Sequence, residues 1–173
     1  MQAQRLNFTI FAIITCNLMD ITYTLKYFTE LTLDELYALM QLRQEVFVVE
    51  QECPYLDADG KDKKAYHLLG RDENGTLRTY ARLLDEGTSY PGFASIGRVI
   101  NAKEIRGLGT GRELIRKSIE TIHQLYPEWP VKIGAQTYLQ KFYEDAGFVD
   151  IGVHYLEDGI PHMQMILQQE GSL

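Results

Sequence analysis

Arg106-Gly107-Leu108-Gly109-Thr110-Gly111-Arg112 follows a short strand-like run, Ser95-Ile96-Gly97-Arg98-Val99-Ile100, and opens a long amphipathic segment. Glycines at this spacing, after a strand and at the start of a helix, let backbone N–H groups converge on an anion, and the helix dipole adds a favourable field. Between Lys103 and Lys117 the basic residues exceed the acidic ones by three. The stretch therefore predicts a cradle for a phosphate or another oxyanion.

Two common phosphate-binding motifs do not fit this stretch. A Walker loop needs Lys followed by Ser or Thr after its last glycine, but Arg112-Glu113 stands there. A dinucleotide fingerprint needs glycine at its sixth position, which is Arg112, and it normally follows the first strand, whereas several strand-like runs precede this loop. A glycine-rich turn that only starts a helix is the structural alternative.

Hydrophobic periodicity outlines the elements on both sides of the loop. Thr32 and Glu35 form a capping-box pattern ahead of about four helical turns, and Asn74-Gly75 is typical of a hairpin turn. Pro127 ends the helix after the glycine-rich loop. The remaining pattern predicts strands at 21–28, 65–71, 76–84, 95–100 and 131–135, a helix at 138–146, and a hairpin of 151–155 with 162–167. Together they predict one mixed α/β sheet.

The composition limits the classes of protein that fit. The chain has 173 residues, enough for one domain with its own core. Its net charge of −7 gives little support for binding nucleic acid or an anionic membrane. Its two cysteines, Cys16 and Cys53, are too few for a disulfide framework and form no CxxC pair, which favours reduced thiols in a cytoplasmic protein.

The N-terminal stretch differs in character from the rest. Residues 8–19 are mostly apolar, but 12 residues are far fewer than the roughly 20 that span a bilayer. Arg5 is the only early basic residue and no Ala-x-Ala site follows it, so secretion is not expected. We therefore expect residues 1–18 to be an N-terminal extension and residues 19–173 to be the domain.

Several motifs, in order along the chain, resemble one enzyme family. Arg106-x-x-Gly109-x-Gly111 resembles the acetyl-CoA pyrophosphate loop of the GNAT N-acetyltransferases, and the run from Tyr138 to Phe148, with Tyr143-x-x-x-Gly147-Phe148 at its end, resembles their second motif. Further runs resemble the ElaA-like branch of that family: Leu42 to Gln51, Cys53-Pro54-Tyr55, Ala135-Gln136, and Tyr155 to His162. The resemblance extends from about residue 21 to 167.

The resemblance implies a fold and a co-substrate. The mixed sheet would be splayed in its middle and flanked by helices, with acetyl-CoA in the opening. Backbone groups of Arg98, Val99 and Ile100 would face the pantetheine arm, and the loop from Arg106 to Arg112 would hold the pyrophosphate. Tyr143 would be the general acid that protonates the leaving thiolate, or else simply a core residue of its helix.

The general base is left open among a water chain and four side chains: Glu50, His67, Glu157 and His162. His67 lies inside a predicted strand, where a hydrogen-bonded structural role is the alternative, and Glu157 lies in a hairpin turn, where solvation is the alternative. Glu50, His67 and His162 are also candidates for binding the acceptor.

The segment from Glu50 to Asp62 holds five acidic residues against Lys61. It either attracts a cationic amine acceptor or is a solvated loop. Asp57-x-Asp59-Gly60 lacks the later glycine and the final glutamate of a calcium loop. A hairpin with alternating polar side chains explains His154, Glu157 and His162 more simply than a metal does, so no metal site is predicted.

Two functions fit these observations. The first is an enzyme that transfers an acetyl group from acetyl-CoA to a primary amine, on a small molecule or a peptide, by direct attack in a ternary complex. The second is a non-catalytic module that binds CoA as a sensor or an interaction partner. Tyr143 beside an intact loop favours the enzyme. A homodimer is compatible with either function.

Overall fold

The computed structural model describes residues 20–168. Its strands are β1 Thr22–Tyr27, β2 Ala65–Arg71, β3 Leu77–Leu84, β4 Ala94–Asn101, β5 Val131–Gln136, β6 Phe148–Glu157 and β7 Ile160–Leu167. Its helices are α1 Leu33–Arg43, α2 Thr110–Leu125 and α3 Gln140–Glu144. Short 3₁₀ turns occur at Phe28–Glu30, Lys61–Lys64, Lys103–Ile105 and Thr137–Leu139. The predicted mixed α/β fold is confirmed.

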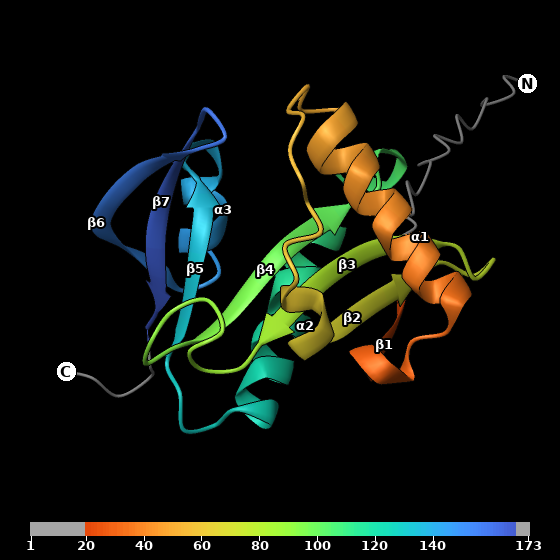
Figure 1. Ribbon diagram of the computed structural model, residues 1–173, viewed down its shortest axis with the longest axis horizontal. Coiled ribbons are helices and arrows are strands. Elements are labelled where there is room, and N and C mark those ends of the chain that lie inside the picture. The colour runs from red at the N-terminus through yellow and green to blue at the C-terminus, as the bar shows by residue number, and fades with distance from the viewer. Residues whose placement is uncertain (1–19, 169–173) are drawn as a thin grey trace, which may run out of the picture.

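The strands form one seven-stranded sheet in the order β1-β2-β3-β4-β5-β7-β6. Neighbouring strands are antiparallel except β4 and β5, which are parallel and pair only at Ala94 with Val131 and at Ser95 with Lys132. Beyond these two pairs the strands diverge, so that β5, β7 and β6 form a separate wing in Figure 1. The predicted splay in the middle of the sheet is confirmed.

Helix α1 begins at the capping box that the sequence predicts. The Glu35 amide donates to Thr32 Oγ1 at 3.2 Å, and the Thr32 amide donates to Glu35 Oε2 at 2.9 Å. After Arg43 the helix widens into a π-helical stretch, Gln44–Val49, and the Glu50 amide donates to the carbonyl of Glu45, five residues earlier. Such widened turns are rare and occur often at functional sites.

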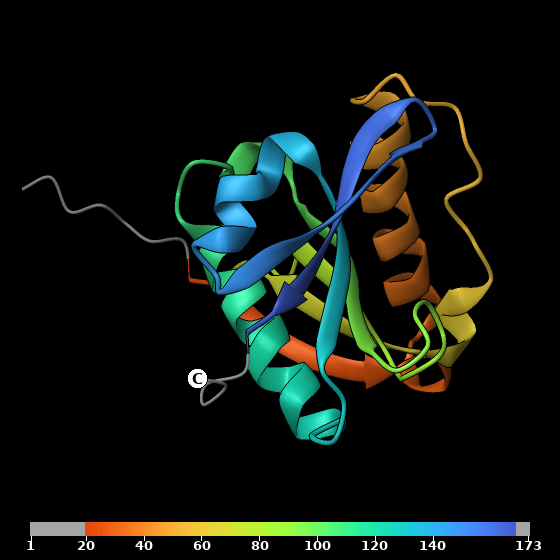
Figure 2. The same ribbon diagram turned by 90° about the vertical axis from the view of Figure 1, so that its left-hand side faces the viewer.

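Two hydrophobic clusters lie on opposite faces of the sheet. One packs the apolar side of α2, including Leu114, Ile115 and Ile122, against β3, β4, β5 and β7. The other packs α1 through Leu39 and Leu42 against β2, β3 and β4. Figure 2 shows α1 on one side of the sheet and α2 with α3 on the other. The sheet therefore has helices on both faces, and the splay opens between them.

The C-terminal elements differ in length from the prediction. The expected helix at 138–146 is a 3₁₀ turn followed by the five residues of α3, and it ends before Gly147, whose φ is +95°. The hairpin is longer than expected because β6 begins at Phe148 rather than 151 and β7 begins at Ile160 rather than 162.

The predicted extension, residues 1–18, and the apolar run 8–19 lie outside the described residues. Within 20–168, no helix is both long enough and apolar enough to cross a membrane.

Gly70 in β2 is a position where any side chain would clash. An added Cβ would meet Thr79 Oγ1 and would lie 2.9 Å from both Ile21 Cγ2 and Tyr23 Cε1. We expect Gly70→Ala to lower the free energy of unfolding by about 1–3 kcal/mol through overpacking, measured by urea denaturation. Gly97→Ala in β4, where a Cβ would have open space, is the control. Equal stability of the two variants would contradict the packing of β1 on β2.

Candidate active site

A cleft of about 500 Å³ occupies the splay between β4 and β5. One wall is β4 from Ile96 to Asn101, and the facing wall is β5 from Gly134 to Gln136. The remaining walls come from the π-helical stretch with the segment after it, from α3, and from the turn between β6 and β7. Because β4 and β5 pair only at Ala94 and Ser95, backbone groups farther along both strands are available to a ligand.

The glycine-rich loop lies where α2 begins. Gly109 caps the helix with a φ of +86°, Gly107 has a φ of +80°, and a Cβ at either would meet no heavy atom within 4 Å. In the part of the chain that the structure describes, no acceptor is found for the amides of Leu108, Gly109 and Thr110. Free amides at the start of a 16-residue helix are suited to an anion.

Only part of the predicted cofactor loop lines the cleft itself. Arg106 and Gly111 do, whereas Gly107, Leu108, Gly109, Thr110 and Arg112 lie beside it at the start of α2. The strand residues Arg98, Val99 and Ile100 all line the cleft. The structure thus brings the predicted strand and loop together at one opening.

The Arg106 side chain is engaged by the protein. Its Nη1 and Nη2 atoms lie 2.7 and 3.1 Å from the Glu50 carboxylate oxygens, and its Nε donates to the Asn101 carbonyl at 3.1 Å. Arg106 therefore ties the loop to β4 and to the end of the π-helical stretch. Glu50, a candidate base, is occupied by the same pair.

Tyr143 lies on α3 with its side chain buried and lining the cleft. Phe142 and Phe148 contact its ring edge to face, at centroid distances of 5.0 and 5.9 Å. Burial, with a smaller contribution from nearby Tyr138, raises the pKa of Tyr143 above its ordinary value. The phenol is therefore protonated at neutral pH.

His162 lies on β7 and also lines the cleft. Its Nδ1 is 2.8 Å from the Ile160 carbonyl, and its ring stacks on Tyr155 at 5.6 Å. A carbonyl only accepts hydrogen bonds, so we assign the proton to Nδ1, which leaves the lone pair of Nε2 available. Glu157, another candidate, lines the same cleft from the hairpin turn.

His67 does not belong to this site. Its side chain is fully buried in β2, Nδ1 lies 2.8 Å from the Tyr80 hydroxyl, and Nε2 lies 3.1 Å from the Asp62 carbonyl. Burial lowers the pKa of His67, which keeps the imidazole neutral. The expectation that it acts as a base is at odds with this position, because both ring nitrogens are used and neither reaches the cleft.

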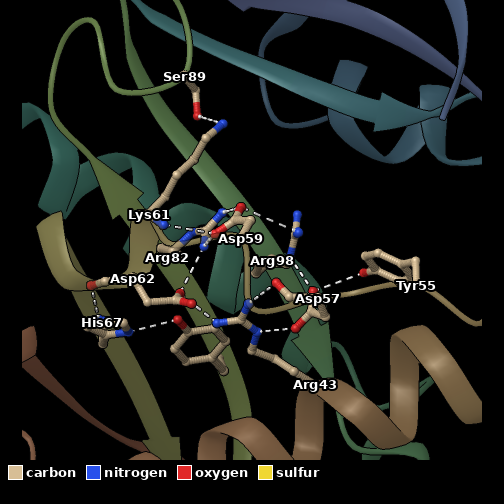
Figure 3. Close-up of polar contacts among 11 residues, drawn as sticks. Arg43, Tyr55, Asp57, Asp59, Lys61, Asp62, His67, Arg82, Ser89 and Arg98 are labelled. Carbon is tan, nitrogen blue, oxygen red and sulfur yellow. Dashed lines mark hydrogen bonds and ion pairs between the residues drawn. The ribbon is translucent and has the colours of Figure 1, made fainter. Parts of the chain in front are cut away.

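Three arginines and three aspartates form a closed ring beside the cleft. Arg43 contacts Asp57 and Asp62 at 2.6 Å each, Arg82 contacts Asp62 at 2.8 Å and Asp59 at 2.7 Å, and Arg98 contacts Asp57 at 2.6 Å and Asp59 at 3.6 Å. Each charge therefore has two neighbours of opposite sign. Figure 3 shows the ring, with Arg43 arising from α1, Arg82 from β3 and Arg98 from β4.

The ring accounts for three of the five acidic residues of the segment from Glu50 to Asp62, whereas Glu50 pairs with Arg106 and Glu52 is exposed. The Asp57 and Asp62 side chains are 3% and 11% exposed, so they are not solvated, and the arginines occupy the carboxylates that might have attracted an amine. Burial alone would raise the pKa of Asp59 and of Asp62. The hydrogen bonds and charges of Arg82 on Asp59, and of Arg43 on Asp62, outweigh burial and lower both pKa values.

The segment after the π-helical stretch crosses from one side of the cleft to the other. Gln51 Oε1 accepts a hydrogen bond from Gln136 of β5 at 3.0 Å, and the Cys53 thiol contacts the Asp158 carbonyl in the β6–β7 turn at 3.6 Å. The segment after the π-helical stretch is therefore linked across the opening to the wing formed by β5, β7 and β6.

Comparison with known proteins agrees with this arrangement. Residues 37–169 match the family described as "Acetyltransferase (GNAT) domain". The chain belongs to the GNAT acetyltransferase family.

Relatives with known sequences or structures cover most of this GNAT domain. A UPF0039 protein of Synechocystis is 42% identical over 150 residues, which cover 87% of this chain and 97% of the relative. Protein ElaA of Escherichia coli is 45% identical over 139 residues, covering 79% and 90%. The crystal structure of an acyl-CoA N-acyltransferase from Pseudomonas aeruginosa has a TM-score of 0.80 at 42% identity, covering 86% of this chain and all of that one.

Sequence reasoning did not identify every residue that shapes this GNAT cleft. Arg43, Arg82 and Tyr55 had no assigned role, although Tyr55 lines the cleft and donates to Asp57 at 2.9 Å. The partners of Arg43 and Arg82 lie 14 to 23 residues away in sequence, so spacing alone gave no signal for the ring. Arg43 and Tyr55 lie in runs that resemble the family, but the resemblance gave neither residue a role.

The ring makes stability depend on pH. Because the folded state holds the pKa of Asp59 below the value near 4 of an unfolded chain, its contribution is complete above about pH 4 and is lost as the pH falls further. We expect Asp59→Asn to lower the free energy of unfolding by about 1–3 kcal/mol at pH 7. The difference from the parent should shrink between pH 4 and pH 2 in urea denaturation.

Asp145→Asn is the control, because it breaks an exposed pair with Lys141. It should change stability by at most about 1 kcal/mol at any pH. A difference between parent and Asp59→Asn that stays constant from pH 7 to pH 2 would contradict the lowered pKa.

Proposed function

We propose that this GNAT domain transfers an acetyl group from acetyl-CoA to a primary amine by direct attack in a ternary complex. The proposal rests on the groups that line one cleft. This cleft contains a protonated phenol, Tyr143, and an imidazole with an available nitrogen, His162, and it adjoins the free amides at the start of α2. Family membership supports an acyl-CoA acyltransferase in general terms.

The residues present suit acetyl-CoA as a co-substrate. Gly107 and Gly109 leave open space in front of the free amides, so a diphosphate can approach the backbone closely. The β4 residues that face the splay offer unpaired backbone groups to an extended, amide-containing arm. A volume of about 500 Å³ lies within the usual range for ligand sites.

The side chains then have distinct roles in the reaction. The thioester is already activated, so the protein must orient the amine, accept a proton from it and protonate the leaving thiolate. His162 Nε2 first accepts a proton from the ammonium group, so that the nitrogen lone pair can attack the carbonyl carbon. As the carbon–sulfur bond breaks, the Tyr143 hydroxyl donates its proton to the sulfur, and the second proton that the nitrogen loses restores the phenol.

His162 is the base that the geometry favours among the candidates. Glu50 is held by Arg106, and His67 is buried away from the cleft. Imidazole is the side chain that most often acts as a base near neutral pH. Glu157 is left to contact the acceptor. Its negative charge suits this role, because an amine arrives in its ammonium form.

Replacing Tyr143 by Phe tests the acid. We expect kcat to fall by about 100-fold, because the thiolate must leave without a proton donor, while the KM for acetyl-CoA changes little. Thiol release is measured with a panel of polyamines, amino acids, aminoglycosides and peptides. Tyr126→Phe, outside the cleft, is the control. Unchanged kcat in Tyr143→Phe would contradict the acid role. A parent protein that binds CoA yet releases no thiol with any amine would instead be the non-catalytic CoA-binding module.

Replacing Gly109 by Val tests the pyrophosphate loop. We expect the affinity for acetyl-CoA to fall at least about tenfold in calorimetry, since a branched side chain blocks the amides and resists a positive φ. Gly75→Val is the matched control, because Gly75 also has a positive φ, of +78°, and open space around it but lies in the β2–β3 turn. Equal affinities in the two variants would contradict the loop assignment.

A further inference from the structure

Arg98 sits at a strained point of β4. Its φ of +52° lies in the left-handed region that residues with a side chain seldom adopt. At this point the pairing of β3 with β4 is interrupted between Tyr80 and Arg82, so β4 forms a bulge. Strained backbone persists only where its surroundings hold it in place. The bulge lines the cleft.

The ion pair with Asp57 holds this bulge. Arg98 Nε donates to Asp57 Oδ1 at 2.6 Å, and the guanidinium lies 5.7 Å from the centre of the Phe47 ring. The Asp57 side chain is 3% exposed, so little water competes for it. Its other oxygen, Oδ2, accepts from Arg43 of α1 at 2.6 Å. Asp57 therefore fixes the bulge relative to α1.

The same Asp57 oxygen also accepts a hydrogen bond from Tyr55. Tyr55 lines the cleft, and its hydroxyl donates to Asp57 Oδ1 at 2.9 Å. Tyr55 and Arg98 thus share one acceptor atom, as Figure 3 shows. A ligand that draws the Tyr55 hydroxyl away removes one of the two donors to Asp57 Oδ1 and so changes the acceptor that Arg98 depends on.

We propose that Tyr55, Asp57 and Arg98 are positioning residues that couple occupancy of the cleft wall at Tyr55 to the shape of the β4 bulge, and thereby to the orientation of the bound thioester. This inference rests on the proposed function. In the proposed function the loop at α2, which contains no member of the ring, holds the pyrophosphate, whereas Arg98 lies in β4, which lines the cleft where the thioester would lie. Disturbing the ring should therefore affect kcat more than KM.

The chain offers a close control for Arg98. Arg78 Nε donates to Asp72 at 2.7 Å, with side-chain exposures of 27% and 5%, against 21% and 3% for Arg98 and Asp57. Arg78→Gln and Arg98→Gln therefore break similar pairs, but only Arg98 lines the cleft. We expect Arg98→Gln to lower kcat by roughly 10- to 100-fold, as misplacement of reacting groups does, with the KM for acetyl-CoA within about threefold of the parent.

Three further results are expected. Arg78→Gln should leave both constants unchanged, Arg98→Lys should recover part of the lost kcat because it keeps the charge, and Tyr55→Phe, which leaves the ring intact, should lower kcat by a few-fold. If Arg98→Gln and Arg78→Gln have the same kcat at similar stability, the positioning role is overturned. If Tyr55→Phe matches the parent, the coupling to the cleft wall is overturned.

A measurement without turnover separates this proposal from the proposed function. The carbonyl resonance of bound acetyl-CoA labelled with ¹³C at the carbonyl should shift in Arg98→Gln and Tyr55→Phe, and should stay in place in Arg78→Gln. Such shifts in a protein that acetylates no amine would support positioning while the proposed function fails. A resonance that is unchanged in Arg98→Gln would overturn positioning even if the parent is an active acetyltransferase.

Discussion

Parallel strands β4 and β5 hydrogen-bond only at Ala94 and Ser95, and from there each strand must satisfy its backbone polar groups in another way. β5 pairs with β7 along its length, and β4 pairs with β3 on both sides of its bulge. The sides of β4 and β5 that face one another are left for a ligand. The cleft, the loop at α2 and the candidate acid and base all lie around this divergence.

A sheet that is open in its middle needs other connections between its halves. The segment that follows α1 supplies them through Gln51 and Cys53, and the ring of arginines and aspartates fixes its far end to β3 and β4. A buried charge is costly unless it is paired and hydrogen-bonded. In the ring each charge has two neighbours of opposite sign, so the three aspartates are fixed against β3 and β4 beside the cleft.

Local features of this fold were predictable from the sequence, because each depends on neighbouring residues. The capping box at Thr32, the Asn74-Gly75 hairpin and the glycines before α2 are of this kind. The splay came from the resemblance alone, since no single stretch encodes where two strands part. The ring, the burial of His67 and the pairing of Arg106 with Glu50 were not predictable, because each joins residues far apart in sequence.

The order of the ring members along the chain bears on how the protein acquires its structure during synthesis. Arg98 follows Asp57 by 41 residues, and both arginine partners of Asp59 come after it in the chain. On a ribosome, Asp57 and Asp62 therefore emerge after one arginine partner, Arg43, whereas Asp59 emerges before both of its partners. The ring closes only once β4 has been made, so the segment from Asp57 to Asp62 reaches its native packing after the strands that follow it in the chain.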